Sequence, residues 1–155
     1  VGLAGGLKAW QGAGGAVETG DVSHPPATFT AARRPHRVAA TPVVEAATRD
    51  DSVLLINALD RDSFASARIP GSVNVPFPEL VDTQGRLRSL EELRPLFESV
   101  GALDPDVTPI AYCGGGIAAT AVAFALRGLG RDDVAVYDGS MNAWTADPER
   151  PLDQG

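Results

Sequence analysis

Three short apolar segments separated by helical patterns constrain the fold of this chain most strongly. Residues 52–58 (SVLLINA), 108–112 (TPIAY) and 134–137 (VAVY) carry no charge, as expected of strands that are buried on both faces. Between the first two, a capping box over residues 89–92 opens a helix that we expect to stop at Gly101. Strands that alternate with helices predict an α/β domain with a mostly parallel central sheet and helices on both of its faces.

Other local signals complete the order of elements. Thr41 followed by Pro42 predicts an N-cap and a helix that runs to about Arg49. We expect Asn74 to bind the backbone around the turn at Pro70. The remaining predicted elements are short: an edge strand over residues 38–40, a helix over 61–65, a turn over 69–72 and a strand over 73–75.

The only cysteine, Cys113, directly follows the strand predicted over residues 108–112. Three glycines come next, and a small apolar helix is predicted over residues 118–126. Consecutive glycines favour neither strand nor helix, so they predict a loop that bends tightly or approaches something closely. If the loop wraps Cys113, its N–H groups and the positive end of the helix favour a thiolate. The alternative is a core cysteine beside a tight turn, and the glycines favour the nucleophile.

Composition excludes several classes of protein. At 155 residues, with 44% hydrophobic and 21% charged residues, the sequence suits one globular domain. A net charge of −7 argues against nucleic-acid and anionic-membrane partners. One cysteine excludes an internal disulfide, and His24 with His36 alone makes a poor metal cluster, so we expect no metal. No apolar run reaches the roughly 18 residues of a membrane span, and the cytoplasm is the expected compartment.

A faint internal repeat links the beginning of the chain to its end. Residues 4–10 (AGGLKAW) align with residues 138–144 (DGSMNAW), with glycine, alanine and tryptophan identical at three positions. We interpret residues 1–20 as the remnant of a preceding, related domain. Residues 21–36 contain three prolines and are typical of an interdomain linker, which leaves residues 37–152 as the main domain. The alternative is an N-terminal helix unrelated to the repeat.

Three motifs, in this order, resemble those of the rhodanese family. Residues 68–77 (RIPGSVNVPF) resemble its His-Ile-Pro-Gly-Ala-x-Asn-x-Pro signature, residues 112–119 (YCGGGIAA) its active-site loop, and residues 136–144 (VYDGSMNAW) its closing strand–helix motif. The resemblance covers roughly residues 38–152. These residues most resemble the C-terminal catalytic domain of a tandem-domain thiosulfate/3-mercaptopyruvate sulfurtransferase. Residues 5–17 resemble the end of the inactive N-terminal domain of such an enzyme.

The resemblance implies sulfur transfer through a persulfide on Cys113, without metal or organic cofactor. The donor would be a small anion, thiosulfate or 3-mercaptopyruvate, and the acceptor a thiol or cyanide. Two half-reactions of this kind are covalent catalysis, and a ring of N–H groups would stabilise the persulfide charge. The residues that the resemblance places in this ring are Gly114, Gly115, Gly116, Ile117 and Ala118.

The loop argues against the phosphatases that share this fold. Those enzymes use an arginine six residues after the cysteine, where this chain has Ala119, so the bidentate clamp for phosphate is missing. The loop sequence Cys-Gly-Gly-Gly-Ile-Ala is nearer to the Cys-Gly-Ser-Gly-Val-Thr of mercaptopyruvate-preferring members than to the Cys-Arg-Lys-Gly-Val-Thr of thiosulfate-preferring ones. It lacks both hydroxyls of the former.

Two arginines of the family are also replaced. Its Asp-Ala-Arg after the buried strand reads Asn57-Ala58-Leu59 here, and a second arginine, before a phenylalanine, is replaced by Ser63. Arg61 or Arg68 is the candidate to supply the missing positive charge to an anionic substrate. The alternative to each is an ordinary solvated side chain.

The resemblance also implies partners. We expect association with the missing N-terminal rhodanese domain, or self-association, to cover apolar surface near the site. A second hypothesis is a sulfur-carrier or regulatory binding module with little turnover of free donors, which the absent cations favour. A third is an inert, structural Cys113.

Overall fold

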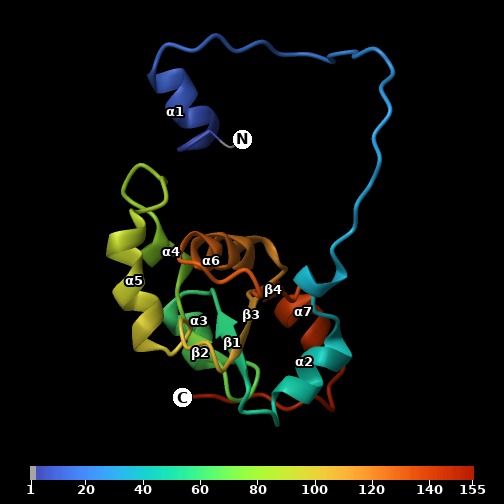
Figure 1. The fold of residues 1–155 in the computed structure, drawn as a ribbon, viewed down its shortest axis with the longest axis vertical. Helices are drawn as coiled ribbons and strands as arrows, with labels where there is room; N and C mark the ends of the chain where they lie inside the picture. Colours follow the sequence, from blue (N-terminus) through green and yellow to red (C-terminus); the bar gives the residue numbers. More distant parts are fainter. Residues whose placement is uncertain (1–2) are drawn as a thin grey trace.

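The structure, a computed structural model, describes residues 3–155 and consists of a folded body and a long arm (Figure 1). The arm carries helix α1 (Gly6–Gly12) and then runs to residue 34 without a helix or strand. The body begins at the short 3-10 helix η1 (Pro35–Arg37). The first two residues of the predicted 1–20 remnant lie outside the described residues.

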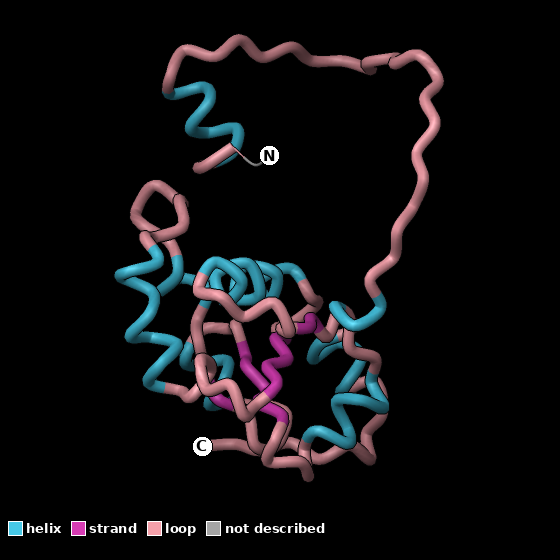
Figure 2. The backbone as a smooth tube through the Cα atoms, in the orientation of Figure 1, coloured by secondary structure: helices cyan, strands magenta, loops and turns pink. Residues whose placement is uncertain are grey.

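A four-stranded, fully parallel sheet forms the centre of the body (Figure 2). Its order is β2-β1-β3-β4, so the two longest strands are central. The strands are β1 (Val53–Asn57), β2 (Val73–Asn74), β3 (Thr108–Tyr112) and β4 (Ala135–Val136). β1 and β3 pair in register from Val53 opposite Thr108 to Asn57 opposite Tyr112, so their carboxyl ends lie together. The predicted parallel α/β architecture is confirmed.

Helices cover both faces of the sheet because alternate strand residues point to opposite sides. Ile56 and Ala111 join one apolar cluster, and Leu55 and Ile110 join the other. The first cluster is covered by α4 (Phe77–Leu80), α5 (Leu90–Ser99) and α6 (Ile117–Gly128), the second by α2 (Thr41–Ala47) and α7 (Ser140–Trp144), and α3 (Arg61–Ser66) links β1 to β2.

Two local predictions near the start of the body were wrong. The predicted edge strand over residues 38–40 is a single parallel bridge between Val38 and Val136, because η1 and α2 leave too little chain between them. Ala40, and not Thr41, is the N-cap of α2, which ends at Ala47. The Thr41 hydroxyl instead lies 2.9 Å from the Tyr137 hydroxyl, a tertiary contact that local sequence does not reveal.

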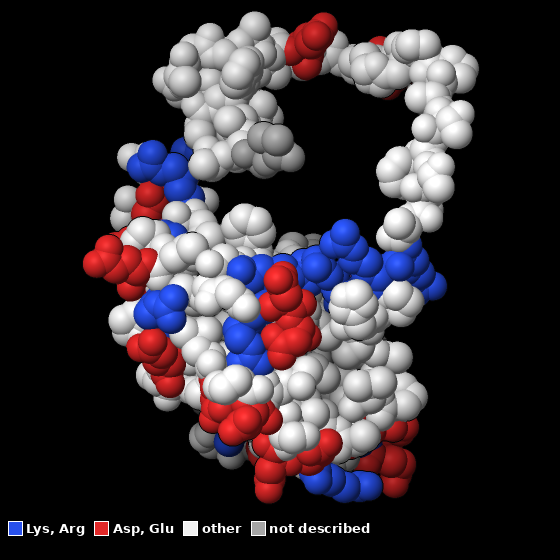
Figure 3. All heavy atoms as spheres, viewed as in Figure 1, with Lys and Arg blue, Asp and Glu red and all other residues white. Residues whose placement is uncertain are grey.

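Charge is distributed unevenly over the body. Acidic side chains are scattered over the visible surface of the body, whereas many Lys and Arg side chains gather on the side of the body that faces the arm (Figure 3). The arm meets the body there through residues 33–37, which include three arginines. This local concentration of positive charge stands out in a chain whose net charge is −7.

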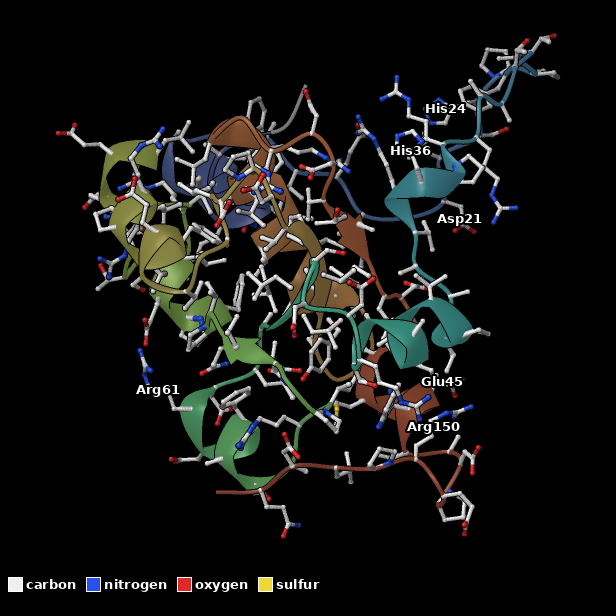
Figure 4. All side chains as sticks on the ribbon, turned by 60° about the horizontal axis from the view of Figure 1, so that its bottom comes forward. Asp21, His24, His36, Glu45, Arg61 and Arg150 are labelled. Atoms are coloured by element: carbon white, nitrogen blue, oxygen red, sulfur yellow. The ribbon has the colours of Figure 1, made fainter. Side chains whose placement is uncertain are left out.

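The described helices are short, α6 being the longest at 12 residues. None of the helices within residues 3–155 is long and apolar enough to cross a membrane. In the same residues, no group of three or more His, Cys, Asp or Glu side chains is placed to hold a metal ion. His24 lies in the arm and His36 in η1, both far from Arg61 in Figure 4.

The Tyr112→Phe variant is expected to lose about 1–3 kcal/mol of unfolding free energy. The Tyr112 hydroxyl accepts the Ile69 N–H at 3.1 Å and donates to Ser72 Oγ at 2.8 Å, so its removal leaves a buried donor unpaired. Tyr137→Phe is the matched control, because its partner Thr41 is only half buried and can bind water instead. Urea unfolding measures both losses, and an equal loss in the two variants would contradict this account.

Candidate active site

Cys113 lies at the carboxyl edge of the sheet, immediately after β3. Its side chain is only 3% exposed and packs in the apolar cluster beneath α6. Its N–H donates to Ser140 Oγ at 3.0 Å, and Ser140 Oγ donates in turn to the Tyr137 carbonyl at 2.7 Å. Ser140 is fully buried and has a φ of 49°, unusual for a residue with a side chain. Sequence reasoning missed this residue, although it lies within the closing motif.

Helix α7 orients the loop that follows Cys113. The Met141 N–H binds the Cys113 carbonyl at 3.0 Å, and the Asn142 N–H binds the Gly114 carbonyl at 2.9 Å. In a planar trans peptide the C=O and N–H point in opposite directions, so the N–H groups of these two peptides point away from α7. Among residues 3–155, the amides of residues 114–116 find no acceptor. The predicted loop of available N–H donors is therefore present.

Only one of the three loop glycines requires glycine for its backbone conformation. Gly116 has a φ of +84°, and a Cβ there would lie 2.7 Å from the Asp138 carbonyl oxygen. Gly115 leaves room for Asn142, whose Nδ2 would lie 3.0 Å from an added Cβ. Ile117 then begins α6 with 85% of its surface exposed. Ala118 follows it in the first turn, where N–H groups have no partner within the helix.

Leu59 occupies the position of the family's first arginine and lies beside the loop. Its Cδ2 would be 3.9 Å from a Cβ added at Gly114. Asn57 Oδ1 accepts the Leu59 N–H at 2.7 Å, and Asn74 Nδ2 donates to the carbonyls of both residues at 2.9–3.0 Å. Asn74 thus holds the turn after β1, so its predicted role at the turn over residues 69–72 was wrong. The result is an apolar wall at this side of the loop.

Arg61 begins α3, close in sequence to this wall. Asp60 caps the helix by accepting the Ser63 N–H at 2.9 Å, and the hydrogen bonds from Ser63 lower the pKa of Asp60 below its usual value. Arg61 Nε donates to Glu79 Oε1 at 3.0 Å, and the Arg61 side chain is 68% exposed, at the edge of the molecule (Figure 4). Such an exposed pair adds little stability.

Arg68 is held by the C-terminal end of the chain. Its Nη1 donates to the Gly155 carbonyl at 2.8 Å, and its guanidinium lies 4.8 Å from the centre of the Phe64 ring. Neither the Arg61 contact nor these contacts involve the loop residues 114–118. The roles of both arginines in binding substrate stay predictions.

The fold and the loop define a parallel α/β protein with a cysteine at a strand–helix junction, followed by backbone amides that find no acceptor among the described residues. The rhodanese-like domain family matches residues 41–147, a range that holds the sheet, the Cys113 loop and α7. This chain belongs to the rhodanese-like domain family.

Two sulfurtransferases are similar in sequence to most of this chain. Thiosulfate/3-mercaptopyruvate sulfurtransferase 2 of Arabidopsis thaliana is 35% identical over 82% of this chain and 40% of its own length. The 3-mercaptopyruvate sulfurtransferase of Escherichia coli is 32% identical over 97% of this chain and 57% of its own length. The chain therefore spans about half the length of these relatives.

A solved structure shows the same fold. The anaerobic ergothioneine biosynthesis enzyme from Chlorobium limicola superposes with a TM-score of 0.89 over 99% of this chain and 41% of that enzyme. The two sequences are 22% identical, so the likeness concerns the fold alone. Because the match covers nearly the whole chain, it includes the arm.

The Gly116→Ala variant is expected to lose about 2 kcal/mol or more of unfolding free energy, because Ala strains the left-handed backbone and collides with Asp138. Gly114→Ala is the matched control, since its Cβ would meet only Leu59 at an ordinary distance and its loss should stay below about 1 kcal/mol. Denaturant unfolding gives both values. Indistinguishable losses would show that Gly116 is not the constrained position.

Proposed function

We propose that this chain is a rhodanese-type sulfurtransferase domain. In this proposal Cys113 carries sulfane sulfur as a persulfide from a small anionic donor, thiosulfate or 3-mercaptopyruvate, to a thiol or cyanide acceptor. The observation that carries it is the loop directly after Cys113, in which the amides of residues 114–116 lack acceptors among the described residues. The names of the Arabidopsis and Escherichia coli relatives support the donor class.

Two displacements at sulfur would complete the reaction. The Cys113 thiolate attacks the outer sulfur of thiosulfate, the sulfur–sulfur bond of the donor breaks, and sulfite leaves with the bonding electrons. The product is a Cys–S–S⁻ persulfide, whose terminal charge the loop amides and the start of α6 stabilise. Cyanide then attacks the terminal sulfur and leaves as thiocyanate, which returns the thiolate.

Burial of Cys113 favours small donors. With 3% of its surface exposed, the thiol is reached only by a compact group. The added sulfur stands about 2 Å beyond the thiolate, so the persulfide is more accessible than the thiol. Gly115 and Ile117 are exposed at the rim where an acceptor would approach.

Arg61 is the better placed of the two arginines to attract the donor. Its ion pair with Glu79 is exposed, and breaking such a pair costs about 0–1 kcal/mol, so the guanidinium can turn toward an anion. Arg68 would have to leave both the Gly155 carbonyl and the Phe64 ring. We keep both as proposed substrate-binding residues.

A sulfur carrier or regulatory binding module is the second candidate function. Leu59 supports it, because an apolar side chain stands beside the loop where a donor-binding arginine would lie in the family. In this reading Cys113 would receive sulfur from a protein and react slowly with free anions.

Intact-protein mass spectrometry after incubation with thiosulfate or with 3-mercaptopyruvate tests the proposal. We expect a gain of one sulfur, about 32 Da, that cyanide discharges and that Cys113→Ser abolishes. Ser99→Ala, in an exposed turn of α5, serves as a matched control that should load normally. If the protein is folded, its thiol is free and it gains no sulfur from either donor, turnover of free donors is refuted. The sulfur-carrier function then remains as the candidate.

The arm supports a second proposal, that residues 1–20 end a preceding rhodanese unit. Trp10 and Trp144 occupy equivalent places in the internal repeat. The indole N–H of Trp10 donates to the Ala16 carbonyl at 2.8 Å, and that of Trp144 donates to the Pro151 carbonyl at 3.0 Å. Each tryptophan thus fastens the chain six or seven residues downstream of itself.

The glycines of the repeat also share a packing constraint. A Cβ at Gly5 would lie 2.7 Å from Ala9 Cβ, and a Cβ at Gly139 would lie 2.6 Å from Ala143 Cβ. In both copies a helix residue therefore closes over a glycine that has no room for a side chain. This shared geometry favours duplication over chance similarity.

The two copies differ in what covers them. Trp144 is 1% exposed in the core of the body, whereas Trp10 is 45% exposed. On the body, Ile117 and Phe124 of α6 are 85% and 67% exposed. We propose that a preceding rhodanese unit, or a second copy of this chain, covers these apolar surfaces.

We also propose that the protein is located in the cytoplasm, where reducing conditions keep a nucleophilic cysteine free.

Sedimentation velocity tests the coverage of α6. For the 155-residue chain, whose mass is 16.1 kDa, we expect self-association that increases with concentration. Phe124→Ser should weaken it by removing exposed apolar area, while Thr120→Ser, on the same helix, should not. A constant mass of 16.1 kDa at every concentration would contradict self-association as the means of covering α6.

A further inference from the structure

A pocket of about 410 Å³ lies between α6, β4 and the residues that join the arm to the body. Its wall is mostly apolar, formed by Val38, Ala123, Phe124 and Val136. Arg37, from η1, and Arg127, near the end of α6, both line it. This pocket is separate from the Cys113 loop, because none of the residues 113–118 lines it.

Both arginines have unused hydrogen-bond donors. The Nε atoms of Arg37 and Arg127 are buried and find no acceptor in the described part of the chain. Arg127 donates one N–H to the Val134 carbonyl at 3.4 Å. The ion pairs among residues 3–155 include neither arginine. Because a guanidinium has five N–H donors, each arginine keeps further donors on its terminal nitrogens for an anion bound in the pocket.

A single acidic residue, Asp138, lines the pocket beside the two arginines. The Asp138 carboxylate packs toward the loop, where Oδ1 would lie 2.8 Å from a Cβ at Gly116. With two guanidinium groups and one carboxylate, the lining of the pocket carries a net positive charge.

We propose that this pocket binds a small organic carboxylate. The carboxylate binds Arg37 and Arg127, because planar guanidinium groups match carboxylates in a bidentate geometry. The apolar part of the ligand packs on Phe124 and Val38, which are 67% and 53% exposed and have no other cover among the described residues. The volume falls in the range of about 300–1,000 Å³ that small-ligand pockets occupy.

One residue of the pocket lining connects the pocket to the loop after Cys113. Asp138 lines the pocket and also lies against Gly116, the N-cap glycine directly before α6. A ligand in the pocket therefore lies one residue away from the loop without touching Cys113. Sulfur transfer itself does not require this site, so the inference goes beyond the proposed function.

Isothermal titration of the 155-residue chain with 3-phenylpropionate, 3-phenylpropanamide and inorganic phosphate tests the proposal. We expect saturable binding of the acid, and binding weaker by roughly tenfold or more for the neutral amide and for phosphate. Arg37→Gln and Arg127→Gln should each weaken the acid by roughly tenfold or more. Arg94→Gln, whose side chain is 52% exposed on α5, is the control and should bind normally.

Two further variants show whether the acid binds at this pocket or at the Cys113 loop, and whether a loss of binding reflects misfolding. Cys113→Ser should bind the acid unchanged, which keeps the result independent of persulfide formation. Phe124→Ala, a change at an exposed side chain, should weaken the acid but not phosphate. The proposal is overturned if the amide or phosphate binds as tightly as the acid. It is also overturned if both arginine variants bind the acid undiminished, or if Cys113→Ser loses binding.

Discussion

The hydrogen bond from the Cys113 N–H to Ser140 Oγ joins the two segments on which the site depends. β3 delivers Cys113 to the carboxyl edge of the sheet, and α7 begins beside it after β4. The Met141 and Asn142 amides hold the Cys113 and Gly114 carbonyls, and Ser140 Oγ holds the Cys113 N–H, so these contacts decide where the loop amides point. The loop after Cys113 is thereby shaped by backbone contacts to the start of α7.

Side-chain to backbone contacts also hold the turn after β1, although this part of the sequence departs from the family pattern. Leu59 stands where the family has an arginine, yet Asn57 and Asn74 hold the turn that carries it by binding main-chain groups. If the proposed sulfur transfer holds, the replacement alters the charge that meets an anionic donor while these contacts keep the turn in place.

The tryptophan of the internal repeat occurs in two environments, once in the arm and once in the body. Trp10 and Trp144 make the same kind of indole hydrogen bond, but only Trp144 is enclosed by a core. Helix α6 lies on the side of the body that faces the arm (Figure 1). Its exposed Phe124 and the pocket lined by Arg37 and Arg127 therefore belong to the part of the body near the arm.

The sequence alone determined the central strands and the loop that follows Cys113, because buried strands and consecutive glycines leave strong local signals. Residues 52–58 and 108–112 could hardly be anything but central strands. Tertiary structure alone decided that Ser140 binds Cys113, that Thr41 meets Tyr137 instead of capping α2, and that Arg37 shares a pocket with Arg127. These pairs are 27, 96 and 90 positions apart, and only the packing of helices on the sheet brings them together.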